Sequence, residues 1–161
     1  MFLHHAHWSE LDPILAYRLL ALRSAVFVVE QECVYPDLDG RDLEPDAEHW
    51  WMTEGERVVA YLRVLTEPGE DGSVRRIGRV VTDPVARGRG LARVTMEAVL
   101  AAHPDSEFVL SGQSHLEDWY AGLGFVPEGE PYLEDGIPHV FMRRGTEGCR
   151  NGRGGRPISS G

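Results

Sequence analysis

The chain has 161 residues, enough for one domain with a single core but too few for two such domains. Its 16 basic residues, all of them arginine, stand against 26 acidic residues, and the formal charge of −10 argues against a nucleic-acid surface and, if anything, favours a cationic partner. No apolar run reaches membrane-spanning length and no signal-peptide pattern opens the chain, so we expect a cytoplasmic protein without a membrane or nucleic-acid partner.

The residues that usually form metal and redox sites give no pattern for either. Cys33 and Cys149 allow at most one disulfide, and neither belongs to a CxxC pair, so free thiols in a reducing compartment are expected. His4, His5 and His7 could bind a metal together, but solvent-exposed histidines are the simpler interpretation. We therefore expect no metal.

A strand and a helix are predicted first. Residues 1–8 favour an edge strand, and Ser9 or Asp12 then offers an N-cap in front of Pro13 at the first helical position. The helix is expected to run to about Val28, although residues 26–29 also fit a strand and leave its end open. Its expected buried side consists of Ile14, Leu15, Leu19, Leu22, Val26 and Val29.

Residues 32–48 form an acidic segment that prolines and a glycine interrupt, which predicts a loop. Asp37, Asp39 and Glu48 match positions one, three and twelve of a calcium-binding loop, but Asp42 stands where the sixth position needs glycine. The calcium match fails there. The interpretation that we favour is a solvated loop or an acidic wall that faces an acceptor.

Three strands are predicted next. Residues 49–53 and 57–65 read as a β-hairpin, and a second turn at residues 67–72 leads into a strand that ends at Thr82. Pro84 removes a backbone donor, so this strand should not continue. Three consecutive antiparallel strands make a meander.

A loop rich in glycine and arginine joins this strand to a helix. Gly88 and Gly90 let the backbone approach a phosphate, and the helix start supplies unpaired N–H groups. Arg87 and Arg89 can donate bidentate hydrogen bonds, so the loop is predicted to bind an anion such as a pyrophosphate. The helix is expected to end at His103-Pro104, and its apolar stripe consists of Leu91, Val94, Ala98 and Ala102, with Thr95 and Val99 beside it.

Two other nucleotide-binding motifs, the P-loop and the Rossmann fingerprint, do not match this loop. A P-loop needs glycine followed by lysine and then serine or threonine, which is absent here. In a Rossmann fingerprint read from Gly88, Arg93 would occupy the place of the third glycine and obstruct close packing of helix on strand. Binding of ATP or NAD is therefore disfavoured.

A second core strand follows the helix. Residues 108–113 are reached by a right-handed crossover and should run parallel to the strand around Val80. A short helix over residues 116–123 comes next, and Gly124 ends it. The remaining strands are expected near Val126 and over residues 138–142.

The last part of the chain differs in composition. Residues 145–161 are rich in glycine and arginine and almost without apolar side chains, so they are expected to be a disordered tail after a domain of residues 1–144. Without interleaved aromatic residues, the arginines of this tail do not indicate RNA binding.

Two motifs together resemble one enzyme family. Arg87, Gly90 and Ala92 match the Arg-x-x-Gly-x-Ala pattern of the acyl-CoA pyrophosphate loop in the GNAT (Gcn5-related) N-acetyltransferases. Residues 119–127 resemble the aromatic-Tyr-x-x-x-Gly-Phe signature that closes the GNAT core, with Tyr120 as its tyrosine. Their order and separation also fit the family.

A third resemblance narrows the family. Residues 26–33, 35–42 and 131–140 look like the ElaA-like branch of GNAT proteins, and the similarity extends from about Leu11 to Arg143. Small departures are Ala92 where glycine is common, Trp119 where phenylalanine is common, and Gly112 before Gln113 in the second core strand. None of them removes a group that the chemistry needs.

The resemblance implies a GNAT acyl-CoA N-acyltransferase fold, an α/β fold with a mixed sheet. An antiparallel meander would be followed by a parallel β-α-β crossover, with the two core strands splayed. Acetyl-CoA would enter the gap as co-substrate, its pantetheine arm beside the first strand and its pyrophosphate on the loop. The cofactor-binding residues so implied are Val80, Val81, Thr82, Arg87, Gly88, Arg89, Gly90, Leu91, Ala92, Gln113 and Tyr120.

The implied reaction is transfer of an acetyl group to a primary amine of a small molecule or peptide by direct attack. Tyr120 would protonate the leaving thiolate, because the resemblance places it there. Glu30, Glu48, His49 and His139 are candidate bases, among which the sequence does not choose, and Glu30 and His139 are retained with Tyr120 as catalytic candidates. The resemblance also allows a homodimer. The alternative is an acyl-CoA-binding sensor or interaction module that lacks a productive acceptor pocket.

Overall fold

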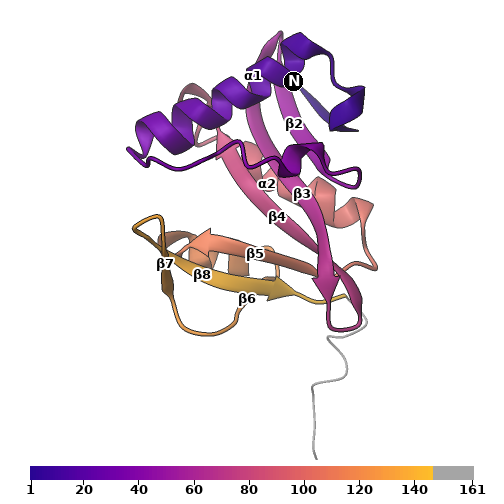
Figure 1. The fold of residues 1–161 in the computed structure, drawn as a ribbon, viewed down its shortest axis with the longest axis vertical. Helices are drawn as coiled ribbons and strands as arrows, with labels where there is room; N and C mark the ends of the chain where they lie inside the picture. Colours follow the sequence, from indigo (N-terminus) through magenta and orange to yellow (C-terminus); the bar gives the residue numbers. More distant parts are fainter. Residues whose placement is uncertain (147–161) are drawn as a thin grey trace, which may run out of the picture.

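One mixed sheet of eight strands organises the computed structural model of the chain, which describes residues 1–146 (Figure 1). The strands are β1 (Phe2–His7), β2 (Glu48–Glu54), β3 (Arg57–Gly69), β4 (Gly72–Thr82), β5 (Phe108–Gln113), β6 (Val126–Pro127), β7 (Tyr132–Glu134) and β8 (Ile137–Arg144). The helices are α1 (Pro13–Arg23), α2 (Leu91–Ala102) and α3 (Glu117–Ala121), with shorter helical segments η1 (Trp8–Glu10), η2 (Ser24–Glu30), η3 (Arg41–Leu43), η4 (Pro84–Ala86) and η5 (Ser114–Leu116). The strand order is β1-β2-β3-β4-β5-β8-β6, with β7 paired to β8.

The predicted meander and crossover are both confirmed. Strands β2, β3 and β4 pair antiparallel in chain order, and β1 adds an edge strand to β2. Helix α2 then carries the chain to β5, which runs parallel to β4. The parallel pairing is short, because it joins only residues 75–77 to residues 108–110. Beyond these pairs the two core strands separate, so they are splayed as expected.

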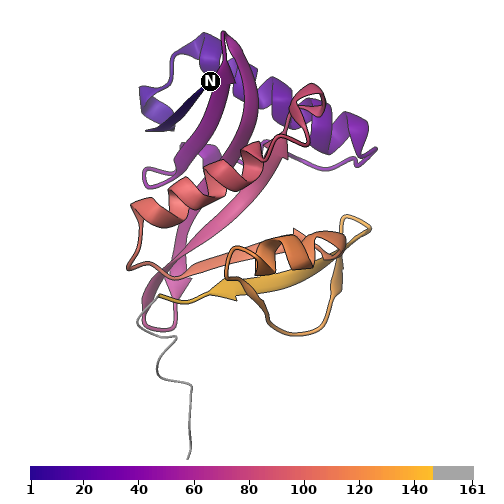
Figure 2. The same cartoon turned by 180° about the vertical axis from the view of Figure 1, so that it is seen from behind.

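Helices cover the two faces of this sheet unequally. Helices α2 and α3 lie on one face, seen from behind in Figure 2. Helix α1 and the chain that follows it lie on the other face, across β2, β3 and β4 (Figure 1). Over β5 and β8 this second face carries no helix from the described residues.

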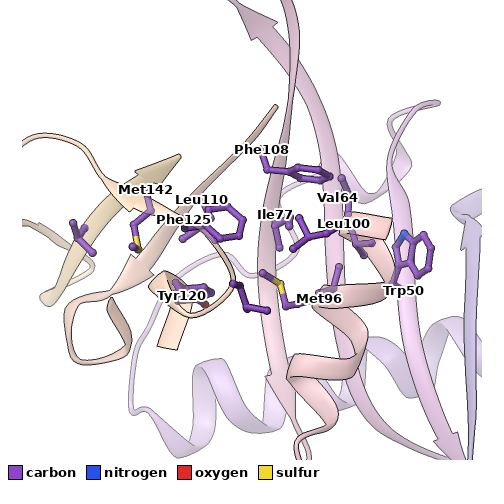
Figure 3. Close-up of a cluster of buried hydrophobic side chains, with 14 residues drawn as sticks. Trp50, Val64, Ile77, Met96, Leu100, Phe108, Leu110, Tyr120, Phe125 and Met142 are labelled. Carbon is purple, nitrogen blue, oxygen red and sulfur yellow. The ribbon is translucent and has the colours of Figure 1, made fainter. Parts of the chain in front are cut away.

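The main hydrophobic core lies between α2, α3 and the first face of the sheet (Figure 3). The buried residues of α2 are Leu91, Thr95, Met96, Val99 and Leu100. The predicted stripe was wrong at Val94 and Ala102, which are exposed. A helix with many small apolar residues has two overlapping stripes, and the longer side chains of Met96 and Leu100 decide which one faces the sheet.

Helix α1 begins at a side-chain cap. The Asp12 carboxylate accepts hydrogen bonds from the backbone N–H groups of Ile14 and Leu15, both at 3.0 Å, so Asp12 rather than Ser9 is the N-cap. After Arg23 the chain continues as the π-helical segment η2 to Glu30, two residues beyond the predicted end. Residues 26–29 are therefore helical, and the strand alternative for them is wrong.

Two residues of the predicted buried side of this helix are exposed. The exposed fraction is 64% for Ile14 and 69% for Val29. Ile14 precedes Leu15 by one residue and so lies about 100° round the helix from it. Val29 follows a π-helical turn, whose wider spacing rotates it away from the face on which Val26 is buried.

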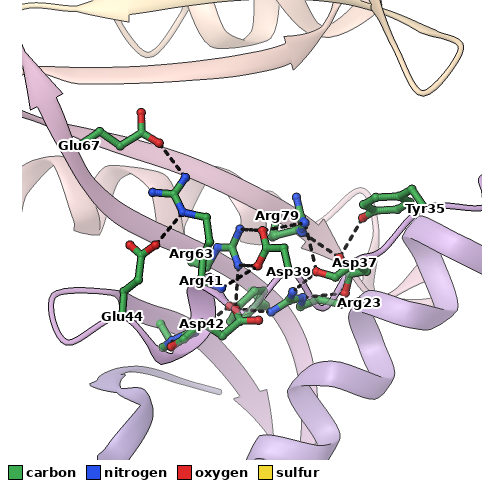
Figure 4. Close-up of polar contacts among 12 residues, drawn as sticks. Arg23, Tyr35, Asp37, Asp39, Arg41, Asp42, Glu44, Arg63, Glu67 and Arg79 are labelled. Carbon is green, nitrogen blue, oxygen red and sulfur yellow. Dashed lines mark hydrogen bonds and ion pairs between the residues drawn. The ribbon is translucent and has the colours of Figure 1, made fainter.

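The acidic segment after η2 is a loop that is solvated only in part, because Asp37, Asp39 and Asp42 pair with arginines (Figure 4). Arg23, which is 0% exposed, donates to Asp37 at 3.0 Å and to Asp42 at 2.6 Å. Arg63 of β3 donates to Asp39 at 2.8 Å and to Asp42 at 3.0 Å. These pairs fasten the segment to the sheet face that α1 also covers.

The remaining comparisons with the sequence predictions concern strand β7, the C-terminal tail, metal ligands and membrane-spanning helices. The strand β7 was not predicted, because its three residues carry no alternating pattern. The predicted disordered tail falls mostly on residues 147–161, which lie outside the described residues. Within residues 1–146 no three metal-ligating side chains gather, and no helix is long and apolar enough to cross a membrane.

Candidate active site

A cleft of about 1100 Å³ opens where β4 and β5 separate. One end is bounded by the loop before α2, and the other end lies over the half of the sheet that α1 leaves uncovered. Every predicted cofactor-binding residue except Arg89 lines it, and so do the catalytic candidates Glu30 and His139. Those lining residues are Glu30, Val80, Val81, Thr82, Arg87, Gly88, Gly90, Leu91, Ala92, Gln113, Tyr120 and His139.

A β-bulge in β4 shapes the wall of the cleft. Tyr61 pairs with Val81 and Arg63 pairs with Gly78, so two residues of β4 face one residue of β3 between these pairs. Arg79, in the bulge, has a φ of 55°, which is uncommon for a residue with a side chain. A bulge leaves backbone groups unpaired in the ladder, and no strand covers this edge of β4 after Ile77 in the part of the chain described. Backbone polar groups of β4 are thus available to an extended ligand.

Ion pairs hold the bulge in place. The Arg79 guanidinium lies 2.8 Å from the Asp37 carboxylate and 3.3 Å from that of Asp39, and it sits over the Tyr35 ring at 5.4 Å. Asp37 also accepts from Arg23, so the acidic segment and the bulge belong to one network (Figure 4). The network therefore supports the strained backbone at the cleft.

The loop before α2 has the backbone of an anion site. Gly88 and Gly90 have φ angles of 76° and 73°, which a side chain would strain, and Gly90 is the residue that precedes the helix. The two arginines of the loop point to different places. Arg87 forms a bidentate pair with Glu30, at 2.8 and 3.0 Å, inside the cleft. Arg89 instead donates to Glu54 of β2, outside the cleft.

The catalytic candidates are also divided by the structure. Glu30 and His139 line the cleft, but Glu48 and His49 do not. Glu48 pairs with Arg75 and with His103, which directly follows α2 on the helix-covered face of the sheet. His49 is fully buried between the Tyr61 hydroxyl at 2.8 Å and the Asp42 carbonyl oxygen at 3.1 Å, and burial lowers its pKa. These two side chains cannot reach a ligand in the cleft.

Tyr120 lies against the backbone of β5 with its hydroxyl at the cleft. The side chain is 6% exposed, and burial raises the pKa of the phenol to about 12. Its hydroxyl has no hydrogen-bond partner among residues 1–146, and the residue lines the cleft, so the hydroxyl is free for a ligand. A Cβ at Gly112 would stand 2.7 Å from a carbon of the Tyr120 ring, so the missing side chain sets the place of the phenol.

We predict that Gly112→Ala lowers turnover about 10-fold or more, because the added methyl group pushes the Tyr120 ring out of position. The measurement is kcat for acyl transfer beside urea unfolding of the same variant. Gly78→Ala is the matched control, since nothing lies within 4 Å of its added Cβ. Equal kcat values for the two variants would refute this role of Gly112.

Sequence reasoning missed Ser111 on the wall opposite Tyr120. Ser111 of β5 and Glu134 of β7 face each other, with the serine hydroxyl donating to the carboxylate at 3.3 Å. The other Glu134 contact is His139 of β8, whose Nε2 atom lies 3.6 Å away. Ser111 had one usable signal, because it is a polar residue inside an otherwise apolar strand.

Comparison with known proteins agrees with this architecture. Residues 22–145 match the family model described as acetyltransferase (GNAT) domain. ElaA of Escherichia coli (strain K12) is 42% identical over 142 residues, which are 86% of this chain and 92% of ElaA. UPF0039 protein Rv2851c of Mycobacterium tuberculosis is 44% identical over 143 residues, which are 88% of this chain and 92% of that protein.

Solved structures give the same result. A crystal structure of an acyl-CoA N-acyltransferase from Pseudomonas aeruginosa superposes with a TM-score of 0.82 at 41% identity, covering 89% of this chain and 99% of that one. The crystal structure of Escherichia coli ElaA gives a TM-score of 0.81 at 39% identity, covering 89% and 98%.

The splayed sheet, the loop and these matches define an acyl-CoA N-acyltransferase fold, and the chain belongs to the GNAT acetyltransferase family. Within that family it is an ElaA-like member, as three stretches of the sequence had indicated.

Proposed function

We propose that this protein transfers an acetyl group from acetyl-CoA directly to a primary amine, in the cytoplasm. The observation that carries the proposal is the free hydroxyl of Tyr120 in a cleft that the glycine loop before α2 bounds at one end. A binding module without transfer would need the loop but would have no use for an unpaired acid in the interior. The acceptor is a small molecule or a peptide.

In this proposal acetyl-CoA lies between the two splayed core strands. Its pantetheine arm pairs with residues 80–82 along the edge of β4 that faces β5, because the pairing of β4 with β5 ends at Ile77. Its pyrophosphate accepts hydrogen bonds from backbone N–H groups of residues 88–92 at the start of α2, where the helix dipole also favours negative charge. Arg87 adds a guanidinium to the same anion.

Tyr120 then protonates the departing thiolate. A free thiol has a pKa of about 8.5 and a phenol of about 10, and burial moves this phenol to about 12. The tyrosine is therefore a protonated acid at neutral pH, but a weak one. It must recover its proton quickly, and the nitrogen that has just become positively charged by attack on the thioester is an adequate source.

The first test of this function is calorimetric titration of the purified protein with acetyl-CoA, with ATP and NAD as parallel controls. Selective binding of acetyl-CoA supports the loop assignment. The second test follows thiol release from acetyl-CoA across polyamines, amino sugars and peptide N-termini. Binding without thiol release from any amine would favour the binding module, and a folded protein that does not bind acetyl-CoA would exclude both.

The two arginines of the loop predict unequal effects on binding. Arg87→Ala should weaken acetyl-CoA binding about 10- to 100-fold, because it removes a charged hydrogen-bond donor from the cleft. Arg89→Ala is the matched control and should change the Kd less than about threefold, because its guanidinium is engaged by Glu54 outside the cleft.

Glu30 competes with the pyrophosphate for Arg87 in the same proposal. Glu30→Gln should therefore strengthen acetyl-CoA binding in the calorimeter, whereas Arg87→Ala weakens it. If Arg87→Ala and Arg89→Ala weakened binding equally, the assignment of Arg87 to the pyrophosphate would be wrong.

A further inference from the structure

The wall opposite Tyr120 carries three side chains that together suit an ammonium group. We propose that Ser111, Glu134 and His139 form the subsite that receives the acceptor amine, with Glu134 binding the ammonium ion and His139 taking its proton. This inference rests on the proposed function, because an amine is needed there only if acyl transfer occurs in the cleft.

The strand register places this subsite where the thioester is expected. The last pair between β4 and β5 joins Ile77 to Leu110, so Ser111 is the first residue of β5 after the strands separate. Gly112 follows it, and the Tyr120 ring packs on that glycine from the helix-covered face. Because side chains alternate along a strand, Ser111 points to the opposite face. The proton donor for the thiolate and the receiver of the amine therefore flank one point of β5.

Glu134 differs from most acidic residues of the cleft because no arginine of residues 1–146 neutralises its negative charge. Glu30, Asp39 and Glu67 line the cleft too, but each is paired with one or two arginines. Glu134 is 50% exposed on its side chain and has no arginine partner among residues 1–146. Its neighbour Asp135 is likewise unpaired with arginine, so the turn between β7 and β8 presents uncompensated negative charge to the cleft. A cationic amine is the complementary ligand.

The backbone contact of His139 determines the tautomer of its neutral ring. Its Nδ1 atom lies 2.7 Å from the Ile137 carbonyl oxygen, which can only accept, so Nδ1 carries the hydrogen. In the neutral ring Nε2 is then an acceptor, and it faces the Glu134 carboxylate at 3.6 Å. Two acceptors face each other without a hydrogen between them. An ammonium group completes this arrangement, since its N–H groups can be donated to both and to the Ser111 oxygen.

The same geometry decides between the two remaining candidate bases. Glu30 is held by Arg87, the residue proposed for the pyrophosphate end of the cleft. The His139 Nε2 atom lies 3.6 Å from Glu134, which also accepts from Ser111, the first residue of β5 after its last pair with β4. His139 therefore lies at the reacting end and Glu30 at the phosphate end, so the base is assigned to His139.

The proton and bond changes balance as follows. The bound ammonium group gives one proton to Nε2 of His139, and the nitrogen lone pair forms a bond to the thioester carbon. The carbon–sulfur bond breaks with its electron pair on sulfur, and the thiolate takes the proton of Tyr120. The amide nitrogen loses its second proton, which restores the phenol through solvent, and His139 releases its proton to solvent. The products are the amide, free CoA and one proton.

The test uses ethylammonium, which can occupy the subsite without knowledge of the natural acceptor. The wild-type protein saturated with CoA is titrated with ethylammonium chloride while NMR follows the ring nitrogens and Cε1–H of His139. We expect a saturable shift of the His139 signals. Tetramethylammonium has the same charge but no N–H donor and should produce no saturable shift.

Two variants separate binding from a structural effect. Glu134→Gln should raise the Kd for ethylammonium at least about 10-fold while leaving the Kd for CoA unchanged. Glu130→Gln is the matched control, because this exposed glutamate of the same segment does not line the cleft. If CoA binds but ethylammonium does not perturb His139, or if both variants behave alike, the subsite is refuted. If CoA itself does not bind, the proposed function fails instead.

A kinetic readout tests the proton transfer to His139. His139→Ala should lower thiol release from acetyl-CoA with ethylamine about 100-fold, and added imidazole should restore part of the rate, because it supplies the missing base. Imidazole should not rescue Tyr120→Phe. A rate that is unchanged in His139→Ala, or a loss that imidazole does not restore, would overturn the assignment of the base.

Discussion

Tyr120→Phe is expected to lower kcat by about 10²- to 10⁴-fold while the Kd for acetyl-CoA stays within about threefold of the wild-type value. The hydroxyl acts on the thiolate, which exists only after the thioester begins to break, so its loss affects the transition state and not the bound ground state. The phenyl ring still packs on Gly112, so the fold is preserved. Single-turnover rates and calorimetric titration measure the two quantities.

The pH dependence of the same step follows from the burial of Tyr120. Because burial raises the pKa of the phenol to about 12, the acid remains protonated throughout the range in which the protein is assayed. Ionisation of Tyr120 should therefore produce no fall in kcat between pH 7 and about pH 10.

Tyr17→Phe, on the exposed side of α1, is the control for Tyr120→Phe and should leave kcat unchanged. A kcat for Tyr120→Phe within threefold of wild type would remove this tyrosine from the mechanism.

The parts of the fold that the sequence predicts are those whose signals are local. The loop of residues 87–90, the N-cap at Asp12 and the β2–β3 hairpin each depend on residues close together in the chain. The residues that line the cleft around this loop could therefore be predicted almost completely. Only the direction of Arg89 could not, because its partner Glu54 is 35 residues away.

The contact between Ser111 and Glu134 could not be predicted, because it joins segments that are distant in the sequence. Ser111 meets Glu134 only because β8 pairs with both β5 and β7. For the same reason the carboxylates of residues 37–42 looked solvent-exposed in the sequence. Their partners Arg23, Arg63 and Arg79 come from three separate elements, and no periodicity connects them.

The largest stability effect is expected at the centre of that network. Arg23→Met should lower the free energy of unfolding by about 3–5 kcal/mol, because it leaves Asp37 and Asp42 buried without their main counter-charge. The matched control is Arg18→Met on the same helix. Its partner Glu56 is mostly exposed, so this change should cost no more than about 1 kcal/mol. Urea unfolding at neutral pH measures both.

Acid should reduce the difference between wild type and Arg23→Met. Burial alone would raise the pKa of Asp42, but the hydrogen bond and charge of Arg23, with Arg63 beside it, hold this pKa below its ordinary value. Such a group contributes stability that is present above the unfolded pKa of about 3.9 and is lost as the pH falls through the lower folded value. Without Arg23 the carboxyl is easier to protonate in the folded state, so the penalty shrinks below about pH 4.

The same substitution connects stability to the cleft. Asp37 pairs with Arg23 and also with Arg79, whose φ of 55° forms the bulge beside the proposed pantetheine site. Under conditions where Arg23→Met remains folded, acetyl-CoA binding should therefore weaken, although Arg23 does not line the cleft. Arg18→Met should not change it. A destabilised variant that binds acetyl-CoA as tightly as wild type would show that the network stabilises the fold without shaping the bulge.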